Sequence, residues 1–280
     1  MENILFPTDF SDVSMNAFLY ALEYAQKTEA KIIVFHAFQE EAEASKQEQK
    51  IYEKIDIQNF RNKKETFPPF EKLISKKGYN DVKVKYVVRE GAFLETFKQY
   101  VFKREDKIDL VVMGTQVSKN HLFELFTESN TVTILDEINK PVIVVPSEAV
   151  FDGRLDNIMF LVDYNDDEKE PLEDLIKQSK QFNSKLHVVH FDLAHGASIV
   201  PLMDRFKNSL ENQNFKNVTY KTIDSINLKQ SLLEYCNDNK IDIVYLINHR
   251  RNFYQRMFTY SLAEDLIKNI NTPIMAIYRD

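Results

Sequence analysis

The sequence predicts an α/β fold with two doubly wound, mostly parallel five-stranded sheets and flanking helices. Its 280 residues suit two domains, since single domains commonly have roughly 100–150 residues. Short runs rich in Val and Ile alternate with longer amphipathic stretches, and the pattern of the first half returns in the second. We therefore predict domains at residues 1–148 and 155–280, called copy one and copy two, with a linker around residues 146–156.

The internal repeat is visible at four places in the sequence. The matching ranges are 3–6 with 157–160, 31–36 with 185–190, 107–112 with 240–245, and 141–145 with 273–277. The offset is 154 positions for the first two pairs, then 133, then 132. The first strand, first helix and second strand therefore keep their total length in both copies.

The elements of copy one follow from apolar periodicity. Apolar runs of four to six residues predict strands buried on both faces, at residues 31–37, 84–88, 108–113 and 141–145. Apolar residues at helical spacing predict helices over residues 11–28 and 129–139. Residues 39–77 are polar and charged, and we interpret them as an elaborated surface helix region that Pro68 and Pro69 interrupt.

Composition narrows the class of protein. The 44% hydrophobic and 28% charged residues are typical of a globular chain, and the net charge of −7 argues against nucleic-acid partners. The single cysteine, Cys236, cannot form an intrachain disulfide, so we expect a cytoplasmic protein. No apolar run approaches the ~20 residues that span a bilayer, and residues 1–10 do not read as a signal peptide, so we expect no membrane partner.

A ligand of such a sheet binds beyond the carboxyl ends of the strands, where strand order reverses. In copy one this directs attention to the residues after the first, second and fourth strands and at the start of the following helix. The candidate binding residues are Pro7, Thr8, Asp9, Ala37, Met113, Gly114, Ser129, Asn130 and Thr131.

The motifs at these places resemble the universal stress protein family, twice, over the whole chain. They are ILFPTDFS at residues 4–11, DLVVMGT at 109–115, SNT at 129–131 and PVIVVP at 141–146. The resemblance implies a tandem member with a Rossmann-like, adenine-nucleotide α-hydrolase-like fold. It also implies that the nine candidate residues would contact ATP or AMP, with the aspartate after strand one at the nucleoside.

The phosphate loop departs from the family pattern of Gly-x-x-Gly, nine residues, then Gly-Ser/Thr. Gly114 matches the first glycine, Val117 stands at the second, and Glu128 stands at the third once one inserted residue is allowed. A glutamate there would repel phosphate, and valine lacks glycine's freedom at positive φ. We therefore expect a degenerate loop in copy one, so that ATP or AMP would bind in the first domain only.

Copy two has no glycine at all in the equivalent loop. Arg250, Arg251 and Arg256 could bind an anion through their side chains, but we favour a solvated or interface-packing basic loop.

Three pairs of repeated residues have a structural interpretation. Asp9 and Asp163 suit nucleoside recognition or capping of the next helix. His36 and His190 end their strands, where a lone histidine is more often hydrogen-bonded in place than a base or a metal ligand. Ser129 and Ser261 are interpreted as helix caps.

The sequence contains no nucleophile elbow, Walker loop, His-Glu-x-x-His or Cys-x-x-Cys motif. We therefore expect a non-enzymatic stress-response scaffold with an unidentified protein partner. A nucleotide-binding protein using the first domain is the alternative, and a slow ATPase would need the phosphate loop that is missing. The apolar last strands, residues 142–145 and 274–277, predict an intrachain dimer of the two copies, with a homodimer as a further prediction.

Overall fold

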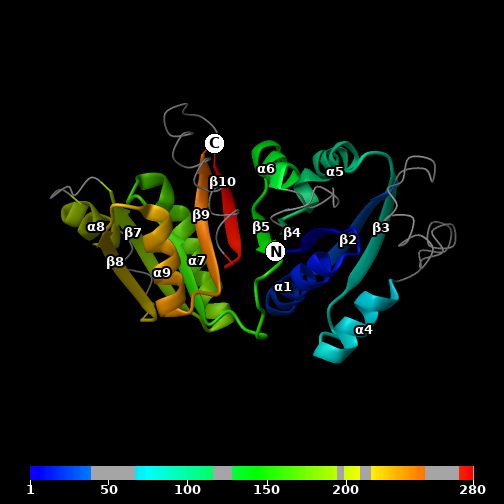
Figure 1. Cartoon of the computed structure of the whole chain (residues 1–280), viewed down its shortest axis with the longest axis horizontal. Helices are drawn as coiled ribbons and strands as arrows, with labels where there is room; N and C mark the ends of the chain where they lie inside the picture. Colours follow the sequence, from blue (N-terminus) through cyan, green and yellow to red (C-terminus); the bar gives the residue numbers. More distant parts are fainter. Residues whose placement is uncertain (39–66, 116–127, 194–198, 209–215, 250–270, 280) are drawn as a thin grey trace. The chain divides into compact units, whose positions relative to one another are not determined.

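The computed structural model of the chain describes residues 1–38, 67–115, 128–193, 199–208, 216–249 and 271–279. These residues form two compact units, Met1–Phe151 and Asp152–Asp280, and each unit contains one copy of the repeat. Both units alternate strands with helices (Figure 1).

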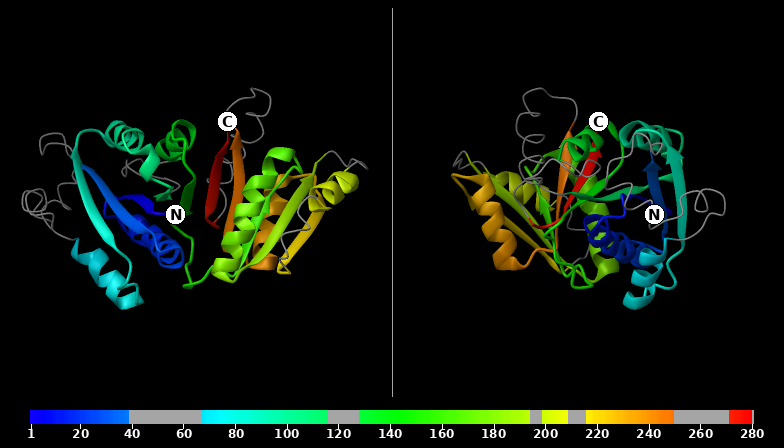
Figure 2. Two further views of the ribbon diagram at one scale, coloured as in Figure 1. Left: turned by 180° about the vertical axis from the view of Figure 1, so that it is seen from behind. Right: turned by 45° about the vertical axis from the view of Figure 1, so that its right-hand side comes forward.

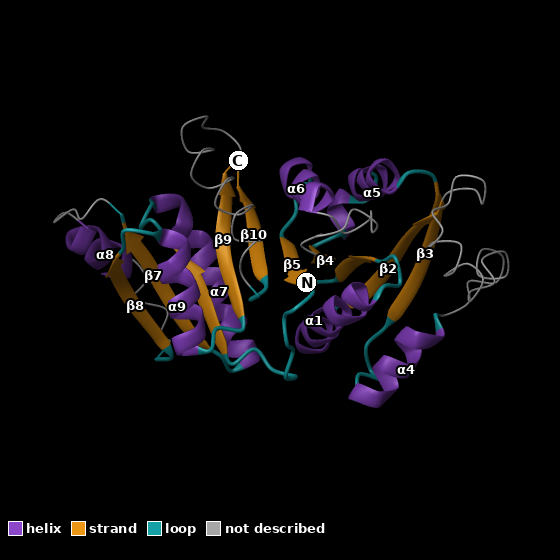
Figure 3. Cartoon of the chain, viewed as in Figure 1, coloured by secondary structure: helices purple, strands orange, loops and turns teal. Residues whose placement is uncertain are grey.

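Copy one is a parallel sheet in the order β3-β2-β1-β4-β5. Its strands are β1 (Asn3–Pro7), β2 (Lys31–Phe38), β3 (Val84–Glu90), β4 (Leu110–Thr115) and β5 (Val142–Pro146). Its helices are α1 (Asp12–Thr28), α4 (Pro68–Lys77), α5 (Phe93–Phe102), η1 (Glu105–Lys107) and α6 (Glu128–Glu137). Figure 3 shows α1 and α4 on one face of this sheet and α5 and α6 on the other. The predicted doubly wound α/β fold is therefore confirmed.

Copy two repeats this order as β8-β7-β6-β9-β10, again with parallel pairing. Its strands are β6 (Asn157–Leu161), β7 (Lys185–Asp192), β8 (Val218–Asp224), β9 (Ile243–His249) and β10 (Ile274–Arg279). Its helices are η2 (Asp166–Glu168), α7 (Lys169–Phe182), α8 (Ile199–Asn208) and α9 (Leu228–Asn239). Helix α7 packs on β7 and α8 on β8, and Figure 2 gives two further views of this unit.

The first strand and helix show why these segments fold as they do. Ile4, Leu5 and Phe6 in β1 are fully buried, as expected for a central parallel strand covered on both faces. Helix α1 begins after Ser11, whose side chain accepts a hydrogen bond from the backbone N–H of Ser14. The helix ends at Glu29, which adopts the left-handed conformation (φ 55°).

Helix α4 corrects the interpretation of Pro68 and Pro69. They begin this helix instead of interrupting one, because proline in the first turn loses no intrahelical hydrogen bond. Phe70 of α4 is fully buried and packs on Phe18 of α1, with ring centroids 4.4 Å apart. The rest of the predicted helical region, residues 39–66, lies outside the described residues.

An aspartate clamp, Asp109 in copy one and Asp242 in copy two, recurs at the start of each sheet. The Asp109 carboxylate accepts a hydrogen bond from the backbone N–H of Asn3 at 3.0 Å, and its own N–H donates to the Asn3 carbonyl at 3.1 Å. Asp242 makes the same two contacts with Asn157, at 2.8 and 2.9 Å. The clamp ties the beginning of the first strand to the beginning of the fourth in both copies.

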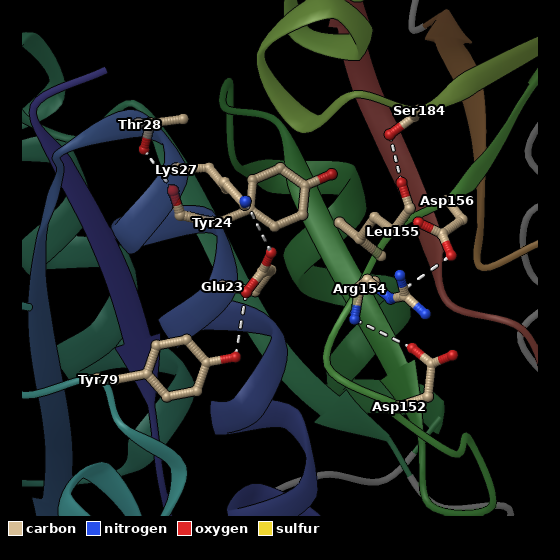
Figure 4. A network of polar contacts seen from close by, with 10 residues as sticks. All are labelled: Glu23, Tyr24, Lys27, Thr28, Tyr79, Asp152, Arg154, Leu155, Asp156 and Ser184. Atoms are coloured by element: carbon tan, nitrogen blue, oxygen red, sulfur yellow. Dashed lines mark hydrogen bonds and ion pairs between the residues drawn. The ribbon is translucent and has the colours of Figure 1, made fainter.

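Further polar contacts lie within each unit (Figure 4). In copy one the Tyr79 hydroxyl donates to the buried Glu23 carboxylate at 3.1 Å. In copy two the Arg154 N–H donates to Asp152 at 3.0 Å, and the Ser184 hydroxyl donates to the Leu155 carbonyl. The Ser184 contact joins Leu155 of the predicted linker to the rest of the second unit, whereas the contact between Arg154 and Asp152 lies within the linker.

Candidate functional site

The candidate residues of copy one gather at the carboxyl edge of its sheet. Strand β1 pairs in parallel with β2 and with β4, so the residues that follow these strands lie at the same edge. Thr8 and Asp9 follow β1, while Ala37 and Gly114 lie near the ends of β2 and β4. Strands β1 and β4 are also where the strand order reverses, which is the place that an open parallel sheet offers to a ligand.

The start of α6 is joined to this edge by a side-chain contact. The Thr131 hydroxyl lies 3.3 Å from that of Thr115 at the end of β4, and both residues are buried. Helix α6 begins at Glu128, so Ser129 lies in its first turn and not at the capping position that we predicted. Pro7 and Met113 belong to β1 and β4 themselves and Asn130 to α6, which places all nine candidates at this edge or in the helix attached to it.

The segment after β1, residues 8–11 and here called the β1 loop, is a tight polar turn. The Thr8 hydroxyl donates to the Ser14 hydroxyl at 3.0 Å and accepts from the Phe10 N–H at 2.9 Å. The Asp9 carboxylate accepts from the Ser11 N–H at 3.0 Å. Phe10 adopts φ 62°, the left-handed conformation that allows so tight a turn.

Asp9 is half-buried at the centre of this loop. Burial raises the pKa of its carboxyl group, and the hydrogen bonds from Ser11 act in the opposite direction. The side chain caps the turn ahead of α1, whereas Ser11 is the helix cap itself. The structure therefore gives a definite geometry for a capping role of Asp9, while nucleoside recognition by this residue stays a prediction.

Both strand-end histidines hold a backbone carbonyl. His36 Nδ1 lies 2.8 Å from the Thr8 carbonyl oxygen, and His190 Nδ1 lies 2.8 Å from that of Val162. A carbonyl oxygen only accepts, so each Nδ1 carries the proton. The rings of Phe10 and Tyr164 cover the two imidazoles at 4.6 and 5.3 Å between centroids. The expected structural role of the two histidines agrees with this arrangement.

Gly114 has a packing role of its own. A Cβ atom at this position would lie 2.8 Å from Val13 Cγ1 and 3.1 Å from the Val13 carbonyl oxygen. Only glycine therefore lets α1 approach β4 this closely, whether or not a phosphate ever binds.

The equivalent loop of copy two, residues 162–165 and here called the β6 loop, has the same backbone form and different chemistry. Tyr164 has φ 61°, matching Phe10. The Asp163 side chain is 68% exposed and its Oδ1 lies 3.4 Å from His190 Nδ1. The buried carboxylate of Glu168 accepts the N–H groups of Asp163 and Asn165, each at 2.8 Å.

Glu168 was missed in the sequence, although a signal existed. The offset of 154 that relates the β1 and β6 loops also places Glu168 opposite Ser14, so a carboxylate replaces a hydroxyl at a buried position of the repeat. Ser14 was missed in the same way.

Several predicted features fall outside the described residues. They are Val117 of the copy-one loop, and Arg250, Arg251, Arg256 and Ser261 of the copy-two loop. Within the described ranges there is no cluster of three or more potential metal ligands. In the same ranges, no helix combines the length and the apolar character that crossing a membrane requires.

The fold and its carboxyl edge define a tandem pair of parallel α/β domains of the type that places ligands at a strand-order reversal. The family model for the universal stress protein family matches residues 1–146 and again residues 154–277. The chain belongs to the universal stress protein family, as a tandem member.

Solved structures agree with this assignment at the level of the fold. A universal stress protein from Archaeoglobus fulgidus is 14% identical, with 99% of this chain and 98% of that chain covered and a TM-score of 0.72. A functionally unknown protein from Pseudomonas aeruginosa is 10% identical, with 100% of this chain and 93% of that chain covered and a TM-score of 0.64. No curated protein matches the chain.

Proposed function

We propose that this protein is a stress-response scaffold that binds a protein partner and catalyses no reaction. The observation that carries the proposal is the internal use of the polar groups at the carboxyl edge of copy one. The Thr8 hydroxyl, the Asp9 carboxylate, the His36 Nδ1 and the Thr131 hydroxyl all have partners within the chain. The replacement of two loop glycines by Val117 and Glu128 gives further support.

The test is thermal unfolding with and without ATP, ADP, AMP and Mg²⁺. A ligand that binds the native state at about 100 times its Kd stabilises it by about 2.7 kcal/mol, which raises Tm by several degrees. The scaffold proposal expects no rise with any of the nucleotides. ATP hydrolysis that survives purification and disappears in Asp9→Ala would contradict the absence of catalysis.

A second candidate is a nucleotide-binding protein that uses copy one, as the family resemblance implies. It is favoured by the place of Asp9, a half-buried carboxyl at the reversal point between β1 and β4. A rise in Tm that Asp9→Ala abolishes would establish it. Asp12→Ala is the matched control, since Asp12 is an exposed residue in the first turn of α1. Gly114 variants are unsuitable here, because they disturb the packing on Val13 directly.

The partner protein and the expected intrachain dimer or homodimer are parts of the same proposal. Light scattering after size-exclusion chromatography measures whether the chain is a monomer or a homodimer in solution.

A further inference from the structure

The β6 loop is held by one buried carboxylate that contacts two backbone N–H groups. Glu168 Oε1 accepts from Asp163 N and Oε2 from Asn165 N, and the residue is only 4% exposed. The contact with Asn165 forms a capping box, in which the Asn165 side chain also accepts from the backbone of Glu168. The contact with Asp163 extends beyond the capping box to the second residue after the end of β6. Glu168 thus spans most of the loop.

In copy one, different side chains hold the equivalent loop. The N–H of Ser11, which corresponds to Asn165, is bonded by the Asp9 carboxylate from within the loop. The residue that corresponds to Glu168 is Ser14, which contacts Thr8 and Ser11 through its hydroxyl. In copy two the Asn165 N–H donates to Glu168 instead of to the Asp163 carboxylate. The Asp163 side chain is largely exposed, and one of its oxygens lies near His190. The two copies therefore share a loop conformation but not the group that holds it.

We propose that Glu168 is a proton-controlled latch, which holds the β6 loop at both N–H groups when ionised and releases one of them on taking up a proton. An ionised carboxylate offers both oxygens as acceptors, whereas a protonated carboxyl has a hydroxyl on one of them. Two backbone donors facing the two oxygens of one carboxyl group are both held strongly only in the ionised form, because a hydroxyl oxygen accepts more weakly than a carboxylate oxygen. The latch concerns copy two alone and does not depend on whether copy one binds a nucleotide.

The surroundings of Glu168 place its titration near neutral pH. Burial raises the pKa of Glu168 to about 7, against the two N–H groups that lower it, and the charges of Asp163 and Asp167 raise it further. Tyr164 is the other titratable side chain of the loop itself.

Strand β7 contributes His190 and Asp192 on the side of Asp163. Burial lowers the pKa of His190, but the Asp163 carboxylate, the Val162 carbonyl and the charge of Asp192 together bring it above its ordinary value. As the pH falls, Glu168 therefore loses one contact with the loop while a charged His190 strengthens its contact with Asp163. At lower pH the loop is therefore held less by Glu168 of η2 and more by His190 of β7.

The experiment is a pH titration of the full chain by two-dimensional ¹H–¹⁵N NMR, following the amides of Asp163 and Asn165 from pH 5 to pH 8.5. We expect both resonances to shift with one common midpoint near neutral pH. In Glu168→Gln, which keeps the size of the side chain, this common transition should disappear. Glu170→Gln, an exposed position on the adjoining helix, should leave it unchanged.

Glu168→Asp provides a second variant should the first fail to fold. It keeps a titratable group, but the side chain is shorter by one methylene, so the two amides should no longer report one shared titration. Resonances that stay flat over this range in the wild type would overturn the proposal. A common transition that persists in Glu168→Gln would overturn it as well, because His190 alone would then account for the shifts.

Discussion

Gly114 is the only glycine of the family's phosphate loop that the sequence keeps at its expected place, and the structure gives it a second reason to be glycine. Its missing side chain makes room for Val13, at the point where α1 crosses β4. A contact between residues 13 and 114 leaves no trace in local sequence patterns, so the packing role could not be predicted. The same distinction applies to the other residues of the site. A role that depends on neighbouring residues can be predicted from the sequence, whereas a role that depends on a distant contact cannot.

Gly114→Ala should destabilise copy one by about 1–3 kcal/mol, because the new methyl group overlaps the Val13 backbone as well as its side chain. Urea unfolding measures the loss. Gly78→Ala is a useful comparison, since it has φ 83° and no atom within 4 Å of a new Cβ, so it reports the cost of backbone strain alone. A Gly114→Ala variant as stable as the wild type would contradict the packing role.

His36→Ala should cost about 1–3 kcal/mol in unfolding free energy, because it leaves the carbonyl of the buried Thr8 without the Nδ1 donor. His36→Asn should recover part of the loss, since the asparagine amide nitrogen can donate from nearly the same position as Nδ1. The two variants are compared by urea unfolding. Equal losses in both would mean that the ring contact with Phe10 matters more than the hydrogen bond.

At the scale of elements, the strands of copy one were the most predictable part. The run at residues 84–88 became β3 (Val84–Glu90) and the run at 141–145 became β5 (Val142–Pro146). The predicted burial on both faces holds for β5 but is wrong for β3, which ends the strand order and leaves Lys85, Arg89 and Glu90 exposed. Boundaries set by capping were less predictable. Pro68 and Pro69 begin α4, and η2 precedes α7 where copy one has a regular helix start. Proline is favoured both in the first turn of a helix and just after its end, and tertiary packing decides between the two positions.

The aspartate clamp makes the stability of copy two depend on pH. Burial raises the pKa of Asp242 to about 6 from an ordinary value of 3.8, and the charges of Asp152 and Asp156 add to the effect. A carboxyl whose folded pKa is raised contributes stability that is complete below pH 3.8 and is lost as the pH rises through about 6.

Asp242→Asn should therefore gain stability relative to the wild type as the pH rises from about 4 to about 7, by about 1–3 kcal/mol. Urea unfolding across this range measures the difference between the two proteins. Asp238→Asn, an exposed position on α9, is the matched control and should follow the wild type. A difference between Asp242→Asn and the wild type that stays constant with pH would contradict the raised pKa.

For the whole molecule, the sequence was sufficient to predict two parallel α/β domains, because the repeated ranges carry the same strand-helix-strand lengths. The strand order within each copy comes from the structure, since the sequence predicted doubly wound parallel sheets without an order. The divergence of the two candidate sites was predicted only in part. Missing glycines can be read directly, but the exchange of Ser14 for Glu168 becomes meaningful only when the N–H groups of Asp163 and Asn165 are placed around the carboxylate.

We expect any adenine nucleotide to bind with a stoichiometry of at most one per chain. In copy two the backbone donors of the β6 loop are already occupied by Glu168, and Asp163 is turned outward. Isothermal titration calorimetry of the full chain gives the number of sites. Two equivalent sites per chain would contradict the difference between the copies.

The pairing of Ser14 with Glu168 across the repeat also bears on how such proteins diverge. In an assembly of two identical chains, one codon change alters both loops at once, and a buried carboxylate would appear in each. Fusion of the two domains into one reading frame removes that symmetry, so one loop can acquire an acidic group while its twin keeps a hydroxyl. The tandem arrangement thus allows one chain to carry the same fold twice, with loops that respond differently to the surrounding pH.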